Sequence, residues 1–410
     1  MNSDVIYLDH QASTPVATEV IDVMLPMFSE QYANSGSVTH LPGRDVAEQV
    51  ERASARIADS IGASASEIVF TSGATESNNL ALLGVCLHPR QKRRRIISVE
   101  TEHRALLDPL KKLAKQGFDV QIVSVLQAGA EQAGVVDMEQ LERLIDDDTA
   151  LVSVMLANNE IGVIQPLKQI AELCRRRGAL LHTDGAQAVG RVPVDVGALD
   201  VDLLSFSAHK CYGPKGVGGL YVRSQGRRVR LAAQIVGGGQ QDNLRSGTLN
   251  TPGVIGMAAA IQLCDKENDW HETRSAEPLW KKLARQSTSL WEHLTSQIPD
   301  LEINGPSVRE LSLDELAKPG TRLPGNLNCS FMPVEGQSLM LATPRIAVSS
   351  GSACTSAEPD VSHVLKAIGL SDDYARSSLR FGIGRGTTDS QLKDAAELLA
   401  DSARRLRQLV

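Results

Sequence analysis

The stretch EIVFTSGATESNNLALLGV, residues 67–85, holds one complete strand–turn–helix unit. Residues 67–71 predict a strand, because the four that follow Glu67 are apolar or strand-favouring, and Gly73 predicts a turn. Residues 76–85 then predict a helix. A strand that passes through a glycine turn into a helix is the repeating unit of α/β proteins, so this stretch indicates that fold class.

The same alternation continues on both sides of that unit. Further strands are predicted at residues 95–99, 119–125, 150–155, 179–183 and 202–206. Helices are predicted between them at residues 104–116, 137–146 and 166–177. Strands that alternate with helices favour a mainly parallel sheet with helices on its faces.

The pattern changes after about residue 265. A long polar helix is predicted at 268–297, followed by short strands and an amphipathic helix at 389–409. We therefore expect a large α/β domain and a smaller α+β domain. The predicted boundaries are 15–265 for the large domain, and 1–14 with 266–410 for the small one.

Composition excludes several classes of protein. The 410 residues carry a net charge of −7, which gives no general attraction to nucleic acid. No apolar run reaches the ~18 residues that span a bilayer, and the first residues lack the pattern of a signal peptide. The six cysteines show no zinc-binding spacing, so we expect a cytoplasmic protein with reduced thiols and no metal.

The basic run Arg90–Arg95 is either a solvated loop or a contact for nucleic acid or a partner.

Lys210 lies at the end of the last predicted strand, in the stretch SFSAHKCYGPKG, residues 205–216. Most lysines are simple surface charges. A lysine between a hydroxyl-rich turn and glycines can instead be partly desolvated, which lowers its pKa and favours Schiff-base chemistry. Pyridoxal 5′-phosphate (PLP) uses such a lysine, together with an acidic partner and a phosphate cradle.

Candidates for these other parts follow other predicted strands. Asp184 follows the strand at 179–183 and can pair with a pyridine nitrogen; the turn TSGATES, residues 71–77, can cradle a phosphate, with Thr75 as a further donor. His103 follows the strand at 95–99 and is a candidate stacking partner and acid/base group. Each feature alone has an ordinary structural explanation. Together they indicate a PLP site, because ligands of open α/β sheets bind beyond the carboxyl ends of strands.

Cys354 lies in the stretch SSGSACTS, residues 349–356. Structural cysteines usually have apolar neighbours, whereas the neighbours here are small and polar. The stretch predicts a mobile loop, at about residues 345–360, that exposes a reactive thiolate. The alternative is a serine- and glycine-rich loop that holds a cysteine by chance.

These motifs resemble, over essentially the whole chain, the cysteine desulfurases of PLP fold type I, which belong to the class-V aminotransferases. The motifs are GATES, NNEIG, DGAQ, SAHKCYGPKG, RSGT and the cysteine loop. The long SSGSAC loop is similar to that of the first desulfurase group, the iron–sulfur and nitrogenase cluster-assembly type. The resemblance implies a large domain with a mainly parallel seven-stranded sheet.

The resemblance also implies roles in cofactor binding. Lys210 would form the Schiff base, Asp184 would pair with the pyridine nitrogen, Gln187 would bond the phenolate oxygen, and Asn159 would lie beside the ring. The phosphate contacts implied are Ala74, Thr75, Ser207, His209 and, from the other subunit of a homodimer, Thr248.

Arg380 and Asn34 would bind the carboxylate of the substrate L-cysteine, and Asn159 would lie beside that carboxylate. The implied reaction converts L-cysteine to L-alanine, with the sulfur held as a persulfide on Cys354. Lys210 would take the α-carbon proton and His103 would manage a thiol proton.

The persulfide would pass to an acceptor protein in iron–sulfur cluster assembly, tRNA thiolation or DNA phosphorothioate modification. The chain ends at Val410, directly after its last predicted helix, and residues 310–324 are longer than in compact relatives. This end favours a dedicated system such as DNA modification. We expect no membrane contact and no direct nucleic-acid binding. The alternatives are a selenocysteine lyase, an aminotransferase, or a non-catalytic docking subunit.

Overall fold

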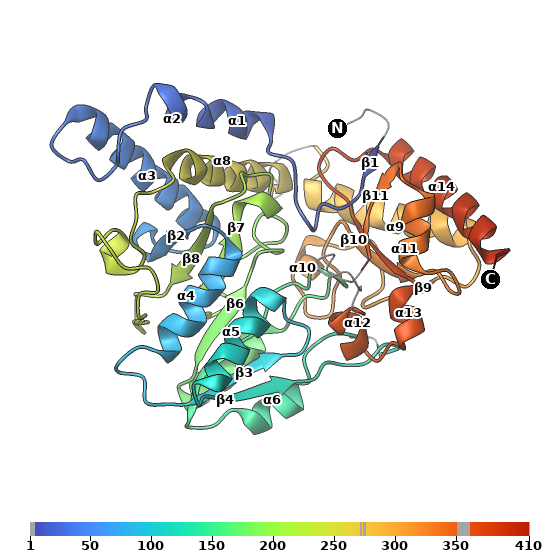
Figure 1. Ribbon diagram of the computed structural model, residues 1–410, viewed down its shortest axis with the longest axis horizontal. Helices are drawn as coiled ribbons and strands as arrows, with labels where there is room; N and C mark the ends of the chain where they lie inside the picture. Colours follow the sequence, from blue (N-terminus) through green and yellow to red (C-terminus); the bar gives the residue numbers. More distant parts are fainter. Residues whose placement is uncertain (1–4, 131, 271–272, 274–275, 351–360, 410) are drawn as a thin grey trace.

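The computed structural model describes residues 5–130, 132–270, 273, 276–350 and 361–409, and these form two lobes (Figure 1). The larger lobe is built on a seven-stranded sheet with the order β2-β8-β7-β6-β5-β3-β4. Its strands are β2 (Ile68–Thr71), β3 (Arg95–Val99), β4 (Asp119–Val123), β5 (Thr149–Ser153), β6 (Leu180–Asp184), β7 (Leu203–Ser207) and β8 (Gly218–Val222). Only β8 runs antiparallel to its neighbours, so the prediction of a mainly parallel seven-stranded sheet is confirmed.

Helices cover both faces of this sheet, and its central strands β5 and β7 are fully buried. One face packs against α4 (Ala74–Cys86) and α5 (Arg104–Lys115). The other face packs against α3 (Leu41–Ser60), α7 (Leu167–Arg177) and α8 (Thr251–Asn268). The lobe also contains the shorter helices α1 (Thr18–Met24), α2 (Pro26–Ser29) and α6 (Met138–Leu144).

The smaller lobe contains a four-stranded antiparallel sheet of order β12-β13-β10-β9. Its strands are β9 (Glu302–Ile303), β10 (Asn326–Ser330), β12 (Ser349–Ser350) and β13 (Ser378–Gly382). The long helices α9 (Leu279–Gln297) and α14 (Asp389–Arg407) pack together beside it (Figure 1). Shorter helices of this lobe are α10 (Leu313–Leu316), α11 (Gly336–Ala342), α12 (His363–Ala367) and α13 (Asp372–Arg376).

The first strand belongs in space with the C-terminal lobe. β1 (Ile6–Tyr7) pairs in parallel with β11 (Ile346–Ala347), far from it in sequence. The chain therefore starts in the smaller lobe, forms the larger one and returns (Figure 1). The exact domain boundaries stay a prediction.

The prediction of one helix over residues 268–297 is wrong. Helix α8 ends at Asn268, because Asp269 takes a left-handed conformation with φ 47° that a helix cannot continue. Helix α9 begins only after Pro278, which suits a helix start and not its interior. Strand β8 was also missing from the strands predicted from residue patterns. Among the described residues, no helix is both long and apolar enough to cross a bilayer.

The basic run before β3 has structural partners. Arg93 donates to the carbonyl oxygens of Thr149 and Arg177, at 3.0 and 2.9 Å. The Arg94 guanidinium lies 3.9 Å from the centre of the Phe118 ring. Arg95 forms ion pairs with two aspartates. These contacts favour a structural role for Arg93, Arg94 and Arg95 over a contact with nucleic acid.

Candidate active site

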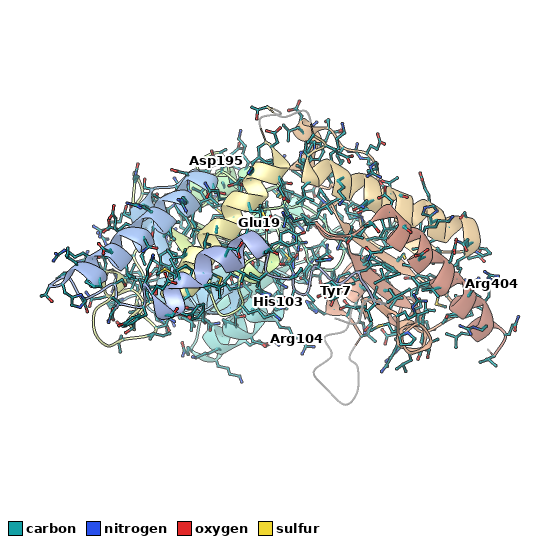
Figure 2. The ribbon with its side chains drawn as sticks, turned by 90° about the horizontal axis from the view of Figure 1, so that it is seen from above. Tyr7, Glu19, His103, Arg104, Asp195 and Arg404 are labelled. Carbon is teal, nitrogen blue, oxygen red and sulfur yellow. The ribbon has the colours of Figure 1, made fainter. Side chains whose placement is uncertain are left out.

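The carboxyl ends of β3, β6 and β7 lie at the same edge of the large sheet and present His103, Asp184 and Lys210. His103 lies near the junction of the two lobes, whereas Arg404 of α14 lies at the outer end of the smaller lobe (Figure 2). The charges of Asp184 and Lys210 both act on the pKa of His103, so the three side chains form one electrostatic unit. The structure therefore brings together residues that the sequence separates by about a hundred positions.

Lys210 ends a short 3₁₀ helix, Ala208–Lys210, that directly follows β7. Its Nζ donates to the carbonyl oxygens of Gln11 and Ala12, at 2.6 and 2.9 Å. Burial, with the nearby charges of Arg191 and Arg380, lowers the pKa of Lys210 to about 7. A large fraction of this amine is therefore neutral and nucleophilic at physiological pH.

Asp184 is the last residue of β6 and is buried. One carboxylate oxygen accepts from the Nδ2 of Asn78, at 2.7 Å, and the other accepts from the backbone N–H of Ala186, at 2.9 Å. Asn78 lies on α4, and sequence reasoning missed it. Its burial is visible only in the structure, since no local pattern of residues marks it. These two donors orient the carboxylate at the sheet edge.

The turn between β2 and α4 forms a cradle for an anion. Gly73 precedes α4 with φ 150° and ψ 177°, a conformation open essentially only to glycine. No side chain among the described residues caps this helix end, so its first backbone N–H groups are available to a ligand. Ser207 borders the turn, since its Oγ would lie 3.7 Å from a Cβ placed on Gly73. Ala74 and Thr75 begin the helix, and the side chain of Thr75 is exposed.

His209 and Gln187 lie beside Lys210 and its carbonyl partners. The ring Nδ1 of His209 is 3.4 Å from the Oγ of Ser13, and burial lowers the pKa of this histidine to about 4. The Nε2 of Gln187 donates to the Gln11 carbonyl at 2.9 Å, while its buried Oε1 has no partner among the described residues. A phenolate oxygen needs a donor, and the Nε2 of Gln187 carries a second N–H that can serve the predicted contact while the first stays on Gln11. Sequence reasoning also missed Gln11, whose backbone carbonyl accepts from both Gln187 and Lys210.

His103 caps the start of α5, where its Nδ1 accepts from the backbone N–H of Ala105 at 3.1 Å. The neutral ring therefore carries its proton on Nε2. Desolvation lowers the pKa of His103, Asp184 raises it, and Lys210 lowers it further. The ring is accessible at the surface of the site, yet the surrounding protein still favours its neutral form.

Arg380 and Asn159 meet at the side of the smaller lobe. The Nη1 of Arg380 donates to the Asn159 carbonyl at 3.2 Å, and its Nη2 pairs with the Asp9 carboxylate at 2.8 Å. The Nε of Arg380 is buried and has no partner among the described residues. The guanidinium is therefore held from two sides and keeps a free donor for an anionic ligand.

Two predicted residues, Asn34 and Thr248, have no hydrogen bond to this cluster among the described residues. Asn34 is exposed in the segment between α2 and α3, which lies on the far side of the larger lobe from the smaller one (Figure 1). Thr248 is also exposed, three residues after Arg245, which pairs with Glu76 of α4 at 2.7 Å. Cys354 and most of its predicted loop lie outside the described residues.

The cluster fits PLP. A buried amine with a lowered pKa, an oriented carboxylate and an uncapped helix start are the three features that this cofactor requires. Two buried polar atoms near Asp184 have no partner within the described part of the chain. They are the Oδ1 of Asn78, whose Nδ2 contacts Asp184, and the Oγ1 of Thr183, which precedes Asp184 in β6. Buried polar groups without partners are rare, and here they are consistent with a site built for a polar ligand.

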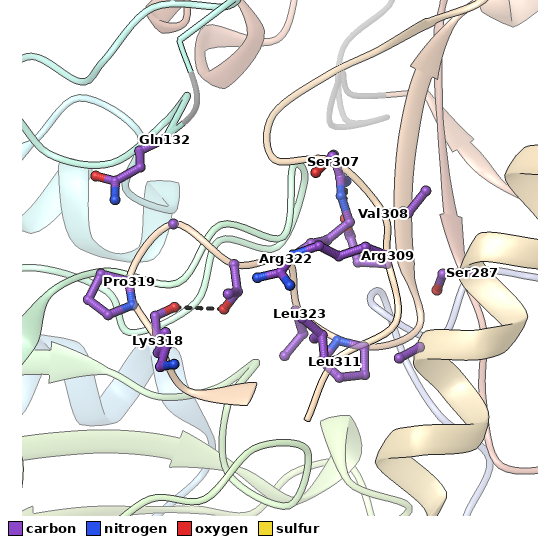
Figure 3. A pocket seen from close by; sticks show the side chains of 15 residues that line it. Gln132, Ser287, Ser307, Val308, Arg309, Leu311, Lys318, Pro319, Arg322 and Leu323 are labelled. Atoms are coloured by element: carbon purple, nitrogen blue, oxygen red, sulfur yellow. Dashed lines mark hydrogen bonds between the residues drawn. The ribbon is translucent and has the colours of Figure 1, made fainter. Parts of the chain in front are cut away.

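A separate cavity of about 330 Å³ lies elsewhere (Figure 3). It is lined mainly by residues 307–326, which include part of the stretch 310–324. Arg322 lines it, but its guanidinium donates to the carbonyls of Asn304 and Pro306 and to the side chain of Asn326. None of the predicted site residues lines this cavity.

Comparison with known proteins agrees with this geometry. The family model for "Aminotransferase class-V" matches residues 6–394. The cysteine desulfurase IscS of Neisseria meningitidis is 45% identical over 406 residues, which cover 98% of this chain and 93% of that protein. A solved structure titled "NifS-like protein" has a TM-score of 0.83 at 32% identity, covering 98% of this chain and 99% of the other.

A structure titled "SspA in complex with cysteine" has a TM-score of 0.75 at 32% identity, covering 92% of this chain and 98% of the other. These relatives span nearly the whole chain and share its α/β architecture. The chain therefore belongs to the PLP-dependent cysteine desulfurases, within the class-V aminotransferase family.

Proposed function

We propose that this enzyme converts L-cysteine to L-alanine and holds the released sulfur as a persulfide on Cys354. One cysteine thiol of the protein and one free L-cysteine give one protein persulfide and one L-alanine, so atoms and electrons balance. The observation that carries the proposal is the buried Lys210 amine, with its pKa lowered to about 7, beside the oriented carboxylate of Asp184.

Lys210 and Asp184 act on the α-carbon of the substrate. PLP, when bound, supplies an electron sink that weakens the bonds at that carbon. The carboxyl group of Asp184 lies at the end of β6, where it would pair with a protonated pyridine nitrogen. Because the Nζ of Lys210 has a pKa near neutrality, it can remove the α-carbon proton and later return a proton to the product.

Arg380 and Asn159 bind the substrate carboxylate in this proposal. The free Nε of Arg380 and its fixed guanidinium support this role, because a positioned arginine holds a carboxylate in one orientation. Asp9 holds the guanidinium in place through its ion pair with the Nη2 of Arg380.

Cys354 is the proposed nucleophile. Its Sγ, as a thiolate, bonds to the substrate sulfur while the carbon–sulfur bond breaks and its electron pair stays with the carbon fragment. Strand β12 supports this assignment, because Ser349 pairs with Arg380 in the sheet. The four residues from Ser350 to position 354 span at most about 14 Å, which keeps the thiol within reach of Arg380. His103 carries its proton on Nε2, because Nδ1 accepts from Ala105, and it is the proposed group that exchanges a proton with the substrate thiol or with Cys354.

The test is a Cys354→Ser variant supplied with PLP, L-cysteine and a reductant. We expect it to bind the cofactor and L-cysteine, as followed by absorption, but to release no sulfide and no alanine. Cys86→Ala is the control and should keep its activity, because burial raises the pKa of the Cys86 thiol to about 12 and makes it unreactive. Equal sulfide release by Cys354→Ser and the wild type would refute the nucleophile. Keto acid as the main product would favour an aminotransferase, and preferential release of selenide would favour a selenocysteine lyase.

We also propose a homodimer with composite sites that works in the cytoplasm. Phe28, Tyr32 and Val236 of the larger lobe are 63, 74 and 80% exposed, which a dimer interface would explain. Asn34 and Thr248 lie near these residues in sequence and apart from the cluster of their own chain, which supports their contribution to a partner's site. A thiol nucleophile requires reducing surroundings, which favours the cytoplasm.

The persulfide passes to an acceptor protein. The acceptor decides whether the enzyme serves iron–sulfur assembly, tRNA thiolation or DNA phosphorothioate modification. Capture of the acceptor by enzyme labelled with ³⁵S-cysteine, followed by non-reducing electrophoresis, would identify it.

A further inference from the structure

The start of α12 is attached to two of the elements that form the site. Ser362 caps this helix, and its Oγ accepts from the backbone N–H of Leu365 at 3.2 Å. The same Oγ donates to the Oε2 of Glu160 at 2.6 Å. The Nε2 of the next residue, His363, donates to the carbonyl oxygen of Glu102 at 2.9 Å. Glu160 directly follows Asn159, and Glu102 directly precedes His103, so α12 contacts the neighbours of two site residues.

The contact between Ser362 and Glu160 is buried. Glu160 is 7% exposed and Ser362 is 4% exposed. Burial raises the pKa of Glu160, while the hydrogen bond from Ser362 and the charges of Arg380 and His363 lower it. A buried carboxyl group that loses its donor is strongly disfavoured, so this contact should hold the two segments together firmly.

The turn that carries Asn159 does not depend on this contact. The Oδ1 of Asn158 accepts from the backbone N–H groups of Glu160 and Ile161, at 2.8 and 3.0 Å. The side-chain amides of Asn326 and Asn328 donate to the Glu160 carbonyl, at 3.2 and 3.3 Å. Since four other hydrogen bonds fix the turn, loss of the Ser362 contact should leave Asn159 in place and loosen the start of α12, which then keeps only the bond from His363 to Glu102.

We propose that Glu160 and Ser362 are positioning residues for the persulfide-forming step, an inference that rests on Cys354 as the proposed nucleophile. Ser362 lies eight residues after Cys354 in the sequence. Ser349 lies five residues before Cys354 and pairs with Arg380 in the sheet. The segments before and after Cys354, which contain Ser349 and Ser362, are therefore attached to the elements that carry Arg380 and Asn159. The Glu160–Ser362 contact fixes the second flank and so improves the alignment of the thiol with the substrate sulfur.

The experiment compares Ser362→Ala with Ser371→Ala in the PLP-loaded full chain. Both serines cap short helices of the smaller lobe, but among the described residues the Ser371 side chain bonds only the backbone N–H of Tyr374, at 3.4 Å. We expect kcat for alanine formation to fall about tenfold in Ser362→Ala, since a misplaced reacting group slows the chemical step. KM for L-cysteine should stay within about twofold of the wild type, because Asn159 and Arg380 keep their contacts. Ser371→Ala should match the wild type.

Hydrogen exchange gives a readout that is independent of activity. Amides of residues 363–367 should exchange faster in Ser362→Ala than in the wild type, and those of 372–376 should not change. If the alanine variant is unstable, Ser362→Gly tests the same contact, because glycine still suits an N-cap.

Substitutions of Glu160 complete the test. Glu160→Ala should reproduce the loss in kcat, whereas Glu160→Gln, which keeps an acceptor oxygen, should restore most of it. The double variant Glu160→Ala with Ser362→Ala should be little worse than either single one, since the two residues act through one contact. An active wild type with Ser362→Ala as fast as Ser371→Ala would overturn the inference. A parallel loss in kcat and L-cysteine binding would also overturn it, by indicating a general structural role. An inactive wild type, or an active Cys354→Ser, would instead refute the proposed function.

Discussion

The reactivity of Lys210 follows from its burial. Only the neutral amine can attack an aldehyde, and the pKa of Lys210 is lowered to about 7. Below that pH the neutral fraction falls about tenfold for each pH unit, and above it the fraction is nearly constant. We expect the rate at which the apoprotein takes up PLP to rise from pH 5 to 7 and to level off above pH 7.

Stopped-flow absorption would measure this rate, with PLP and a free ε-amine of ordinary pKa as the reference reaction. The reference rate should continue to rise well above pH 9. An uptake rate that rises in the same way in the protein would show that Lys210 is an ordinary, solvated lysine. Lys215 offers a matched control, because it is exposed and its replacement by alanine should leave the profile unchanged.

Asp184 acts through its charge, which can be separated from its shape. An Asp184→Asn variant keeps an oxygen for the Asn78 amide but loses the negative charge. We expect kcat/KM for L-cysteine to fall by about 10²-fold or more, as is typical when a preorganised electrostatic partner is removed. Asp195→Asn, at an exposed aspartate of the same lobe, should stay within about twofold of the wild type. Full activity of Asp184→Asn would contradict the role of the carboxylate.

Single residues were predictable where they follow a strand. Lys210, Asp184 and His103 each follow a strong strand pattern, and parallel strands bring their carboxyl ends to one edge. Asn78 and Gln11 were not predicted, because their roles depend on contacts with Asp184 and Gln187 that are 106 and 176 residues away in sequence. No local pattern marks a buried amide that serves a distant carboxylate.

At the scale of elements, α4 depends on the glycine that precedes it. Gly73 has φ 150° and ψ 177°, which an alanine adopts only with strain of about 1–3 kcal/mol. A Cβ at this position would meet only the Oγ of Ser207, at 3.7 Å, so strain and not a clash would act on the turn. We expect Gly73→Ala to weaken PLP binding by about tenfold or more, because relaxation of the turn would move the N–H groups of the cradle.

An absorption titration of apoprotein with PLP would measure this change. Gly216→Ala is the matched control, since Gly216 also has a positive φ of 79° and nothing lies near its would-be Cβ. The control should lose some stability and keep the affinity for PLP. Equal affinity of Gly73→Ala and the wild type would mean that the α4 turn is not the phosphate cradle.

Elements were predictable where local patterns and tertiary packing agree. The strand at 95–99 and the helix at 166–177 have clear periodicity and nearly the predicted ends. The prediction of one helix at 268–297 is wrong, because the run of polar residues does not reveal that α8 ends before Asp269 and that α9 begins after Pro278. Strand β8 begins with two glycines, which weaken a strand pattern, and it forms only because β2 and β7 pair with it on both sides.

At the scale of the whole molecule, the described part of one chain does not bring Thr248 into contact with the other predicted cofactor-binding residues. Thr248 is exposed, and exposed apolar side chains such as Phe28 and Tyr32 lie on the same lobe. If a C2 dimer covers this surface, each site takes Lys210 from one chain and Thr248 from the other. A heterodimer of a Lys210→Ala chain and a Thr248→Ala chain should then contain one intact site, because both substitutions fall in its other site.

The experiment co-expresses Lys210→Ala and Thr248→Ala chains with different tags and purifies the heterodimer. The Lys210→Ala homodimer should be inactive, and Thr248→Ala should be weak at limiting PLP, since loss of a charge-assisted hydrogen bond costs about 1.5–3 kcal/mol. The heterodimer should reach about half of the wild-type activity, because one of its two symmetric sites is intact. If each chain supplied its own Thr248, the only site with Lys210 would lack Thr248, and the heterodimer could not exceed the Thr248→Ala homodimer. That result would contradict composite sites, and analytical ultracentrifugation of the same sample would report whether the dimer itself forms.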